Sequence, residues 1–207
     1  MTFQVGILPG INITLAYDAL PLERINRDQL RKSLNDPQVV VMDTPDLIVA
    51  IAPTKGLLVH VGDRRIRIID QKQTAPHKTE LAALAAKLHA SVAGSALLAY
   101  GFNYDLSLQA QGTQSPAQIL KARFLPDEER LAALVQGSIE IMAPRLIFQR
   151  RQARYDLVFQ PDDDRLKAHV NIHYEGGTLP DGVRLQAALD NEAQDMIALL
   201  ASLFPKD

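Results

Sequence analysis

The stretch LAYGFNYDLSLQ, residues 98–109, decides the fold. Its apolar residues alternate with small or polar ones: Leu98, Tyr100, Phe102, Tyr104, Leu106 and Leu108. Because side chains of a strand point to opposite faces in turn, this pattern predicts one long strand with an apolar face and a polar face. At ~3.3 Å per residue the strand would span about 40 Å, well beyond the usual five or six residues. Such a strand is typical of a wide antiparallel sheet with only one covered face.

The segments around this strand predict an α+β fold, with an antiparallel sheet and helices on one of its faces. Alternating or apolar runs predict strands at 3–17, 47–52, 57–61, 65–69, 139–149, 153–160 and 165–175. Leucine-rich spacing predicts helices that begin at Asn26, at Glu80, twice within 111–137, and near Ala193. Pro205 would end the last helix.

Three helix starts carry residues that favour capping. Asn26 with Gln29 three residues later, Thr79 before the second helix, and Ser115 before a proline all fit the preferred chemistry of an N-cap. Gly94 suits a left-handed residue at the end of the second helix.

The two halves of the chain show a faint internal repeat. PDLI at 45–48 compares with PRLI at 144–147, and DRRI at 63–66 with DRLK at 164–167. A leucine-rich helix follows each set. A duplicated unit of helix, three-stranded meander and helix is therefore one interpretation, and chance similarity between two common meanders is the other.

Length and composition set the broad class. The 207 residues suit one compact domain over 1–207, with two similar halves at about 1–110 and 111–207 as the alternative. The absence of cysteine excludes disulfides, thiol catalysis and cysteine-ligated metal centres. The opening MTFQVGILPG lacks the pattern of a signal peptide, and no apolar run approaches eighteen residues. We therefore expect a soluble, cytoplasmic protein with no membrane partner.

The charge balance bears on nucleic-acid binding. A net charge of -2 argues against strong non-specific binding to phosphates, although it leaves room for a local basic patch. The absence of tryptophan and the small number of other aromatic residues also weaken the case for a base-stacking surface. Nucleic acid is thus a disfavoured partner that the sequence does not exclude.

Two histidines and a run of three aspartates are residue types that bind metal ions, but their spacing does not match a metal site. His169 and His173 share the polar side of the strand 165–175, where four residues separate the imidazoles by roughly 13 Å. One ion, bound at ~2.1 Å from each nitrogen, could not bridge them. Asp162, Asp163 and Asp164 lack the alternation of a calcium loop and suit a hairpin turn. We predict no metal and no cofactor, and we favour solvent-exposed histidines over ligand-binding ones.

Arginines gather near two predicted hairpins: Arg64, Arg65 and Arg67 at the first, and Arg150, Arg151 and Arg154 at the second. Arginine can clamp a phosphate or a carboxylate with two parallel hydrogen bonds. It can equally protect a turn or a sheet edge from aggregation, and we favour this reading. If the two halves match, the two hairpins would instead form a shared anion site.

No catalytic signature is present. The sequence has no Gly-x-Gly-x-x-Gly, no phosphate loop, no Gly-x-Ser-x-Gly and no cysteine nucleophile. Catalytic residues can also assemble from distant positions, so this absence only lowers the odds of an enzyme. The sequence identifies no catalytic residue, so the catalytic residues stay unknown, and we lean towards a protein that is not an enzyme.

A resemblance to a family rests on VGDRRIRI at 61–68, the helix after it and YGFNY at 100–104. These segments, within 45–110, resemble a sporadically distributed family of uncharacterised bacterial proteins. In that family a similar hairpin and helix precede a strand with a Gly-Leu-Arg-Tyr-x-Asn-like core. Here Phe102-Asn103 stands in place of Leu-Arg. The resemblance implies a bacterial, cytoplasmic accessory protein, and it carries no site residue.

The leading hypothesis is a non-enzymatic binding or interaction protein that uses the polar sheet face. The candidate residues are Arg65, Arg67, Asn103, Asp105, His169, Asn171, His173, Arg151 and Arg154. A protein partner or self-association as a homodimer is favoured, since wide sheets expose edges. A small anionic ligand is the alternative partner. The runner-up function is an enzyme or regulator that binds a phosphorylated or nucleic-acid ligand through the arginine hairpins, and a structural scaffold is the third.

Overall fold

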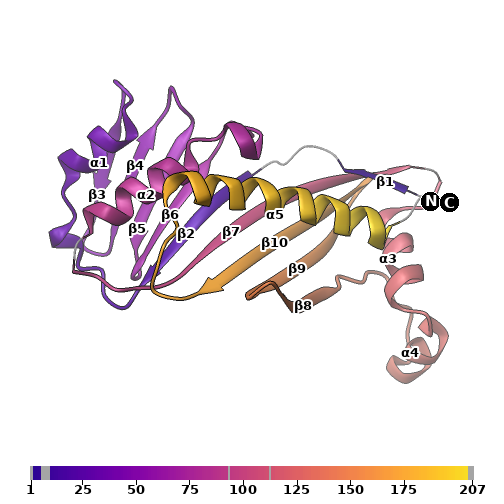
Figure 1. The fold of residues 1–207 in the computed structure, drawn as a ribbon. Helices are drawn as coiled ribbons and strands as arrows, with labels where there is room; N and C mark the ends of the chain where they lie inside the picture. The colour runs from indigo at the N-terminus through magenta and orange to yellow at the C-terminus, as the bar shows by residue number, and fades with distance from the viewer. Residues whose placement is uncertain (1, 6–9, 93, 112, 205–207) are drawn as a thin grey trace.

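The structure is a computed structural model that describes residues 2–5, 10–92, 94–111 and 113–204 (Figure 1). Its strands are β1 (Thr2–Val5), β2 (Gly10–Tyr17), β3 (Val40–Asp43), β4 (Leu47–Ala52), β5 (Leu57–Gly62), β6 (Arg65–Asp70), β7 (Leu97–Gln111), β8 (Arg145–Arg150), β9 (Ala153–Asp162) and β10 (Arg165–Glu175). Its α-helices are α1 (Arg27–Leu34), α2 (Leu81–Ser91), α3 (Pro116–Phe124), α4 (Glu128–Val135) and α5 (Gly182–Leu203). Short 3-10 helices cover Leu22–Arg24 and Pro76–Lys78.

All the strands belong to one antiparallel sheet in the order β3-β4-β5-β6-β2-β7-β10-β9-β8, and β1 pairs with β7 beyond β2. The predicted α+β fold with an antiparallel sheet is therefore confirmed. Counted outward from the centre, β2 is followed by β6, β5 and β4, and β7 by β10, β9 and β8. The two halves thus share a strand order. The duplication itself stays a prediction.

The long strand β7 follows the predicted alternation over most of its length. From Tyr100 to Leu108 its apolar side chains face the covered side, and Phe102, Tyr104 and Leu108 are fully buried. The prediction was wrong for Leu98, whose side chain is 53% exposed. The pairing between β2 and β7 shifts register between Ala16 and Tyr17, so Leu97 takes the buried position instead.

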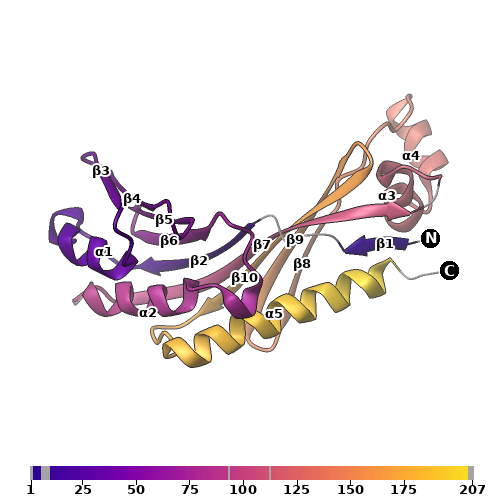
Figure 2. The ribbon, with the colours of Figure 1, turned by 90° about the horizontal axis from the view of Figure 1, so that it is seen from above.

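The helices pack on one face of the sheet, as expected. Figure 2 shows α2 and α5 lying along the same side, with α5 running diagonally under β7, β10 and β9. At one end, Phe124 of α3 stacks on Phe159 of β9 at 5.8 Å, which places α3 against the same core. Helix α4 buries none of its residues and stands away from the body (Figures 1 and 2).

Buried hydroxyl groups attach α5 to the sheet. Glu192 of α5 is only 6% exposed, and its carboxylate accepts hydrogen bonds from Tyr155 at 3.0 Å and from Tyr174 at 2.7 Å. The Tyr104 hydroxyl donates to the backbone oxygen of Leu189 at 2.7 Å. Burial and the Glu192 hydrogen bond raise the pKa of Tyr155 to about 12. These polar contacts fix the register of α5 against the strands.

Two of the predicted caps are confirmed and one was wrong. Asn26 accepts from the backbone of Gln29, and Ser115 forms a reciprocal capping box before α3. Thr79 does not cap α2. Its hydroxyl donates to the buried Asp70 carboxylate at 2.6 Å, because the chain enters α2 from a 3-10 turn that aims this side chain at β6.

The largest differences between the observed elements and the sequence prediction are four. The structure adds β3, β8 begins at Arg145 rather than 139, and α5 begins at Gly182, well before Ala193. The expected strand 3–17 divides into β1 and β2; residues 6–9 between them and Pro205 lie outside the described residues. No helix in the described part of the chain is long and apolar enough to cross a membrane.

Candidate functional site: the open face of the sheet

The sheet face opposite α2 and α5, called the open face here, carries a row of arginine and histidine side chains across the strands, with small residues at its centre. Strand pairing places side by side His60 of β5, Arg67 of β6, Thr14 of β2, Gly101 of β7, His173 of β10 and Arg154 of β9. We call this set the cation row. Neighbouring strands lie ~4.8 Å apart, so four spacings separate Arg67 from Arg154 by about 19 Å.

A shallow hollow of about 230 Å³ lies at the centre of the cation row. Its base is formed by small residues, among them Ala16, Ala99 and Gly101. A Cβ atom at Gly101 would lie 2.7 Å from the backbone oxygen of Ile172, so the base there is bare backbone. Arg65 and Arg67 line the side on β6, and Asn171 and His173 line the side on β10. Cationic and amide groups therefore face each other across a low base.

Two further hollows extend the central one along the row. A hollow of about 250 Å³ also uses Arg65 and Arg67, and it reaches His60 and β4. A hollow of about 280 Å³ also uses His173, and it reaches Arg154 and β8. Because they share lining residues, the three hollows form one band across the sheet.

A row of amides borders the central hollow. Asn171 donates to the Asn103 side-chain oxygen at 2.6 Å, and Asn103 donates to that of Asn12 at 2.8 Å. The Thr14 hydroxyl also donates to Asn12 at 3.3 Å. Asn103 is 8% exposed, so these hydrogen bonds satisfy a nearly buried amide and hold the border in place.

Charges on the open face divide into paired and unpaired groups. The Asp105 carboxylate binds His169 at 2.7 Å, Asp156 binds Arg145, and Asp162 binds Lys167 at 2.9 Å. By contrast, the side chains of three arginines of the band form no hydrogen bond or ion pair with any described residue. These are Arg65, Arg67 and Arg154. The band therefore presents free guanidinium groups beside neutralised charges.

Two pKa shifts follow from the paired groups. The hydrogen bond with Asp105 raises the pKa of His169 above its usual range, against the opposing effect of burial. The hydrogen bond from Arg145 lowers the pKa of Asp156. Both interactions stabilise the charged forms of His169 and Asp156.

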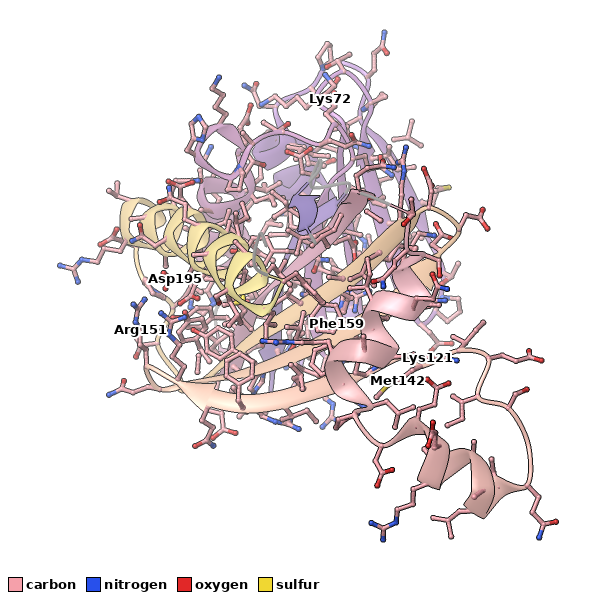
Figure 3. All side chains as sticks on the ribbon, turned by 90° about the vertical axis from the view of Figure 1, so that its right-hand side faces the viewer. Lys72, Lys121, Met142, Arg151, Phe159 and Asp195 are labelled. Atoms are coloured by element: carbon pink, nitrogen blue, oxygen red, sulfur yellow. The ribbon has the colours of Figure 1, made fainter. Side chains whose placement is uncertain are left out.

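Arg151 differs from the other candidate arginines because it is ion-paired. It binds Asp195 of α5 at 2.5 Å, and Arg150 binds the same carboxylate at 3.3 Å (Figure 3). Arg151 lies in the tight β8–β9 turn with a φ of 51°, where the chain reverses beside α5. Arg151 still lines the hollow on β9 together with Arg154, but its ion pair with Asp195 distinguishes it from Arg154, whose side chain forms no ion pair with a described residue.

The remaining candidates lie together on the open face. Arg65, Arg67, Asn103, Asn171 and His173 line the central hollow. Asp105 and His169 lie on the same face, displaced along β7 and β10 and paired with each other.

Sequence reasoning missed several parts of the site, among them Thr14, Ala16 and Gly101. The alternation of Asn12, Thr14 and Ala16 in β2 was the available signal, since it puts small and polar groups on one face. The central place of β2 beside β7 comes from long-range pairing that no local pattern reveals.

An apolar row runs beside the cation row at the β3 end of the open face. Strand pairing aligns Val40, Ile51, Leu58 and Ile69, and Asn12 continues the line on β2. Val40 is 51% exposed, and the other three are half-buried. This apolar row and the band together give the open face both apolar and cationic contact surface.

Among the described residues, no group of three or more His, Asp or Glu side chains could hold a metal ion. No protein-family model matches the chain, and no curated protein matches its sequence.

Proposed function

We propose that this protein is a non-enzymatic binding protein that receives a partner on the open face. One observation carries the proposal: Arg65 and Arg67 stand without a counter-ion beside a hollow whose base is formed by small residues. A guanidinium group offers a rigid fork of donors to a carboxylate or phosphate, and free arginines of this kind are enriched at binding surfaces. The apolar row beside them supports a protein partner.

Binding is better supported than catalysis. The Asp105 and His169 pair would orient an imidazole as a general base, but the second ring nitrogen of His169 has no hydrogen-bond partner among the described residues. A nucleophile within hydrogen-bond reach of the base is the usual requirement for covalent catalysis.

The alternative is an enzyme or regulator that binds a phosphorylated or nucleic-acid ligand through both arginine hairpins. It has weaker support, because Asp195 already occupies Arg150 and Arg151. Asp195 offsets one of these two positive charges and contacts both guanidinium groups, which leaves fewer free donors for a phosphate.

Further parts of the proposal concern assembly and location. We infer a cytoplasmic bacterial protein from the family resemblance, which the cysteine-free sequence fits. A homodimer through the sheet edge β3 is a subsidiary proposal, supported by the exposure of Val40 and Met42 there.

A photo-crosslinking experiment in cells tests the binding face. Benzoylphenylalanine in place of Val49, on the open face beside His60, should give a discrete crosslinked product. The same residue in place of Arg184, on α5, should give none. Replacing Arg67 and His173 with alanine should remove the Val49 product. Crosslinks that persist in this double variant, or that form only from the Arg184 position, would contradict the proposal.

A further inference from the structure

We propose that the open face binds an acidic, extended polypeptide segment of a partner protein, laid across the strands along the cation row. This inference rests on the proposed function and names the chemical class of the partner. Its carboxylates would meet Arg65 and Arg67 at the central hollow and Arg154 at the hollow on β9. Apolar side chains of the same segment would contact the apolar row.

The charge distribution along the band supports an anionic occupant. None of the residues lining the central hollow carries a carboxylate. Asp46 and Asp63 lie in the hollow at the β4 end, and Glu175 lies in the hollow at the β8 end. Acidic groups therefore line only the two end hollows, and the central hollow keeps the unpaired Arg65 and Arg67, while Arg154 shares its hollow with Glu175.

The geometry sets a spacing for the carboxylates of the segment. About 19 Å separates Arg67 from Arg154 across four strand spacings of ~4.8 Å. An extended chain advances ~3.3 Å per residue, so about six residues would separate the two acidic positions. A single small anion would fill only the central hollow and leave Arg154 unused.

Aromatic placement favours a polypeptide over a nucleic acid. Single-stranded nucleic acids bind by stacking bases on exposed aromatic rings. Among the residues whose side chains the structure describes, the tyrosine and phenylalanine side chains of the strands lie on the covered side: Tyr17, Tyr100, Phe102, Tyr104, Phe148, Tyr155, Phe159 and Tyr174. The open face offers the apolar row instead, which suits aliphatic side chains.

Synthetic peptides test the inference with the full-length protein. Fluorescein-labelled peptides would carry two Glu-Glu pairs joined by Gly-Ser spacers of different length, with leucines at one end. Fluorescence anisotropy at low salt measures their affinity. We expect the tightest binding when the acidic pairs lie about six residues apart, roughly tenfold tighter than when two residues separate them, because both arginine sites are then engaged at once. Gln in place of Glu should abolish binding.

Matched variants locate the peptide. Arg67→Gln and Arg154→Gln should each weaken the best peptide by about tenfold and remove its spacing preference, the loss of one charge-assisted contact. Arg184→Gln removes the same charge from the helix side, where the side chain is 83% exposed, and should leave the affinity unchanged. Equal loss in all three variants would overturn the inference, since it would indicate non-specific charge attraction.

Two further probes separate this inference from the proposed function. If an oligothymidine binds in an Arg67-dependent manner and the peptides do not, the inference of an acidic polypeptide partner is wrong. The proposal that the open face binds a partner is then retained. If inorganic phosphate displaces every peptide equally and spacing has no effect, the site holds one small anion and the inference is again wrong. If no probe binds and Val49 gives no crosslink, both proposals fail.

Discussion

The two faces of β10 share one backbone and differ in almost everything else. The residues that face the helices are at most 2% exposed: Leu166, Ala168, Val170 and Ile172. Toward the open face the intervening residues are charged or polar: Lys167, His169, Asn171 and His173. The covered face supplies the hydrophobic stabilisation, and the open face has no packing role that requires its arginines and histidines. Stability and binding should therefore respond to different substitutions.

The largest expected effect is on the covered face. Phe102→Ala removes a fully buried ring that meets Tyr100 and Tyr174 edge-on. The free energy of unfolding should fall by about 3–5 kcal/mol, as for other large-to-small core changes. Urea denaturation measures it. A loss below about 1 kcal/mol would mean that the covered face does not dominate stability.

The second largest loss of stability is expected when the hydrogen bonds between α5 and the sheet are removed. Glu192→Ala leaves the Tyr155 and Tyr174 hydroxyls without their buried acceptor, and we expect a loss of about 2–4 kcal/mol. Glu192→Gln keeps an acceptor oxygen and should lose less. Thermal unfolding of both variants decides the matter, and equal losses would show that hydrogen bonding is not the cause.

Gly101 forms part of the base of the central hollow. In Gly101→Ala the new methyl group would meet the Ile172 backbone oxygen at 2.7 Å, and backbone cannot move aside as a flexible side chain can. We expect about 1–3 kcal/mol of destabilisation and a weaker affinity for acidic peptides, because the base of the hollow rises. Gly137→Ala is the control, since its nearest neighbour lies 3.9 Å away. A stable Gly101→Ala that binds normally would show that the hollow is not used.

The smallest expected effect is a pH-dependent contribution of the Asp105–His169 pair, on the open face, to the free energy of unfolding. Asp105 raises the pKa of His169, so the pair stabilises the folded state fully below the unfolded pKa. That contribution is lost as pH rises through the raised pKa of the folded state. Because both side chains are half-exposed, it should stay below about 1 kcal/mol. NMR titration should find the His169 pKa lower in Asp105→Asn, and an unchanged pKa would rule out the pair.

Local patterns predicted the parts of the fold that depend on neighbours in sequence. The bounds of β10 matched the prediction at 165–175, and the caps at Asn26 and Ser115 formed as expected. The prediction that Leu98 is buried was wrong because its exposure depends on a register shift against β2, a segment about eighty residues away in sequence. Likewise β3 forms only by pairing with β4, so its short, half-exposed sequence gave no clear signal.

The candidate site, like the fold, was predicted where it depends on local sequence patterns and missed where it depends on long-range contacts. Alternation correctly placed Asn103, Asn171 and His173 on one face of the sheet. The ion pair that occupies Arg151 joins residues 44 positions apart, and no spacing rule could reveal it. The strand order that brings Arg67 beside Thr14 and Gly101 is equally non-local.

The most direct measurement compares stability and crosslinking in one protein, the triple variant Arg65→Gln, Arg67→Gln and His173→Gln. We expect its free energy of unfolding to stay within about 0.5 kcal/mol of the parent, as for other surface changes, while the partner crosslink from position 49 disappears. A variant that keeps the crosslink, with its stability intact, would show that the cationic side chains of the open face do not hold the partner.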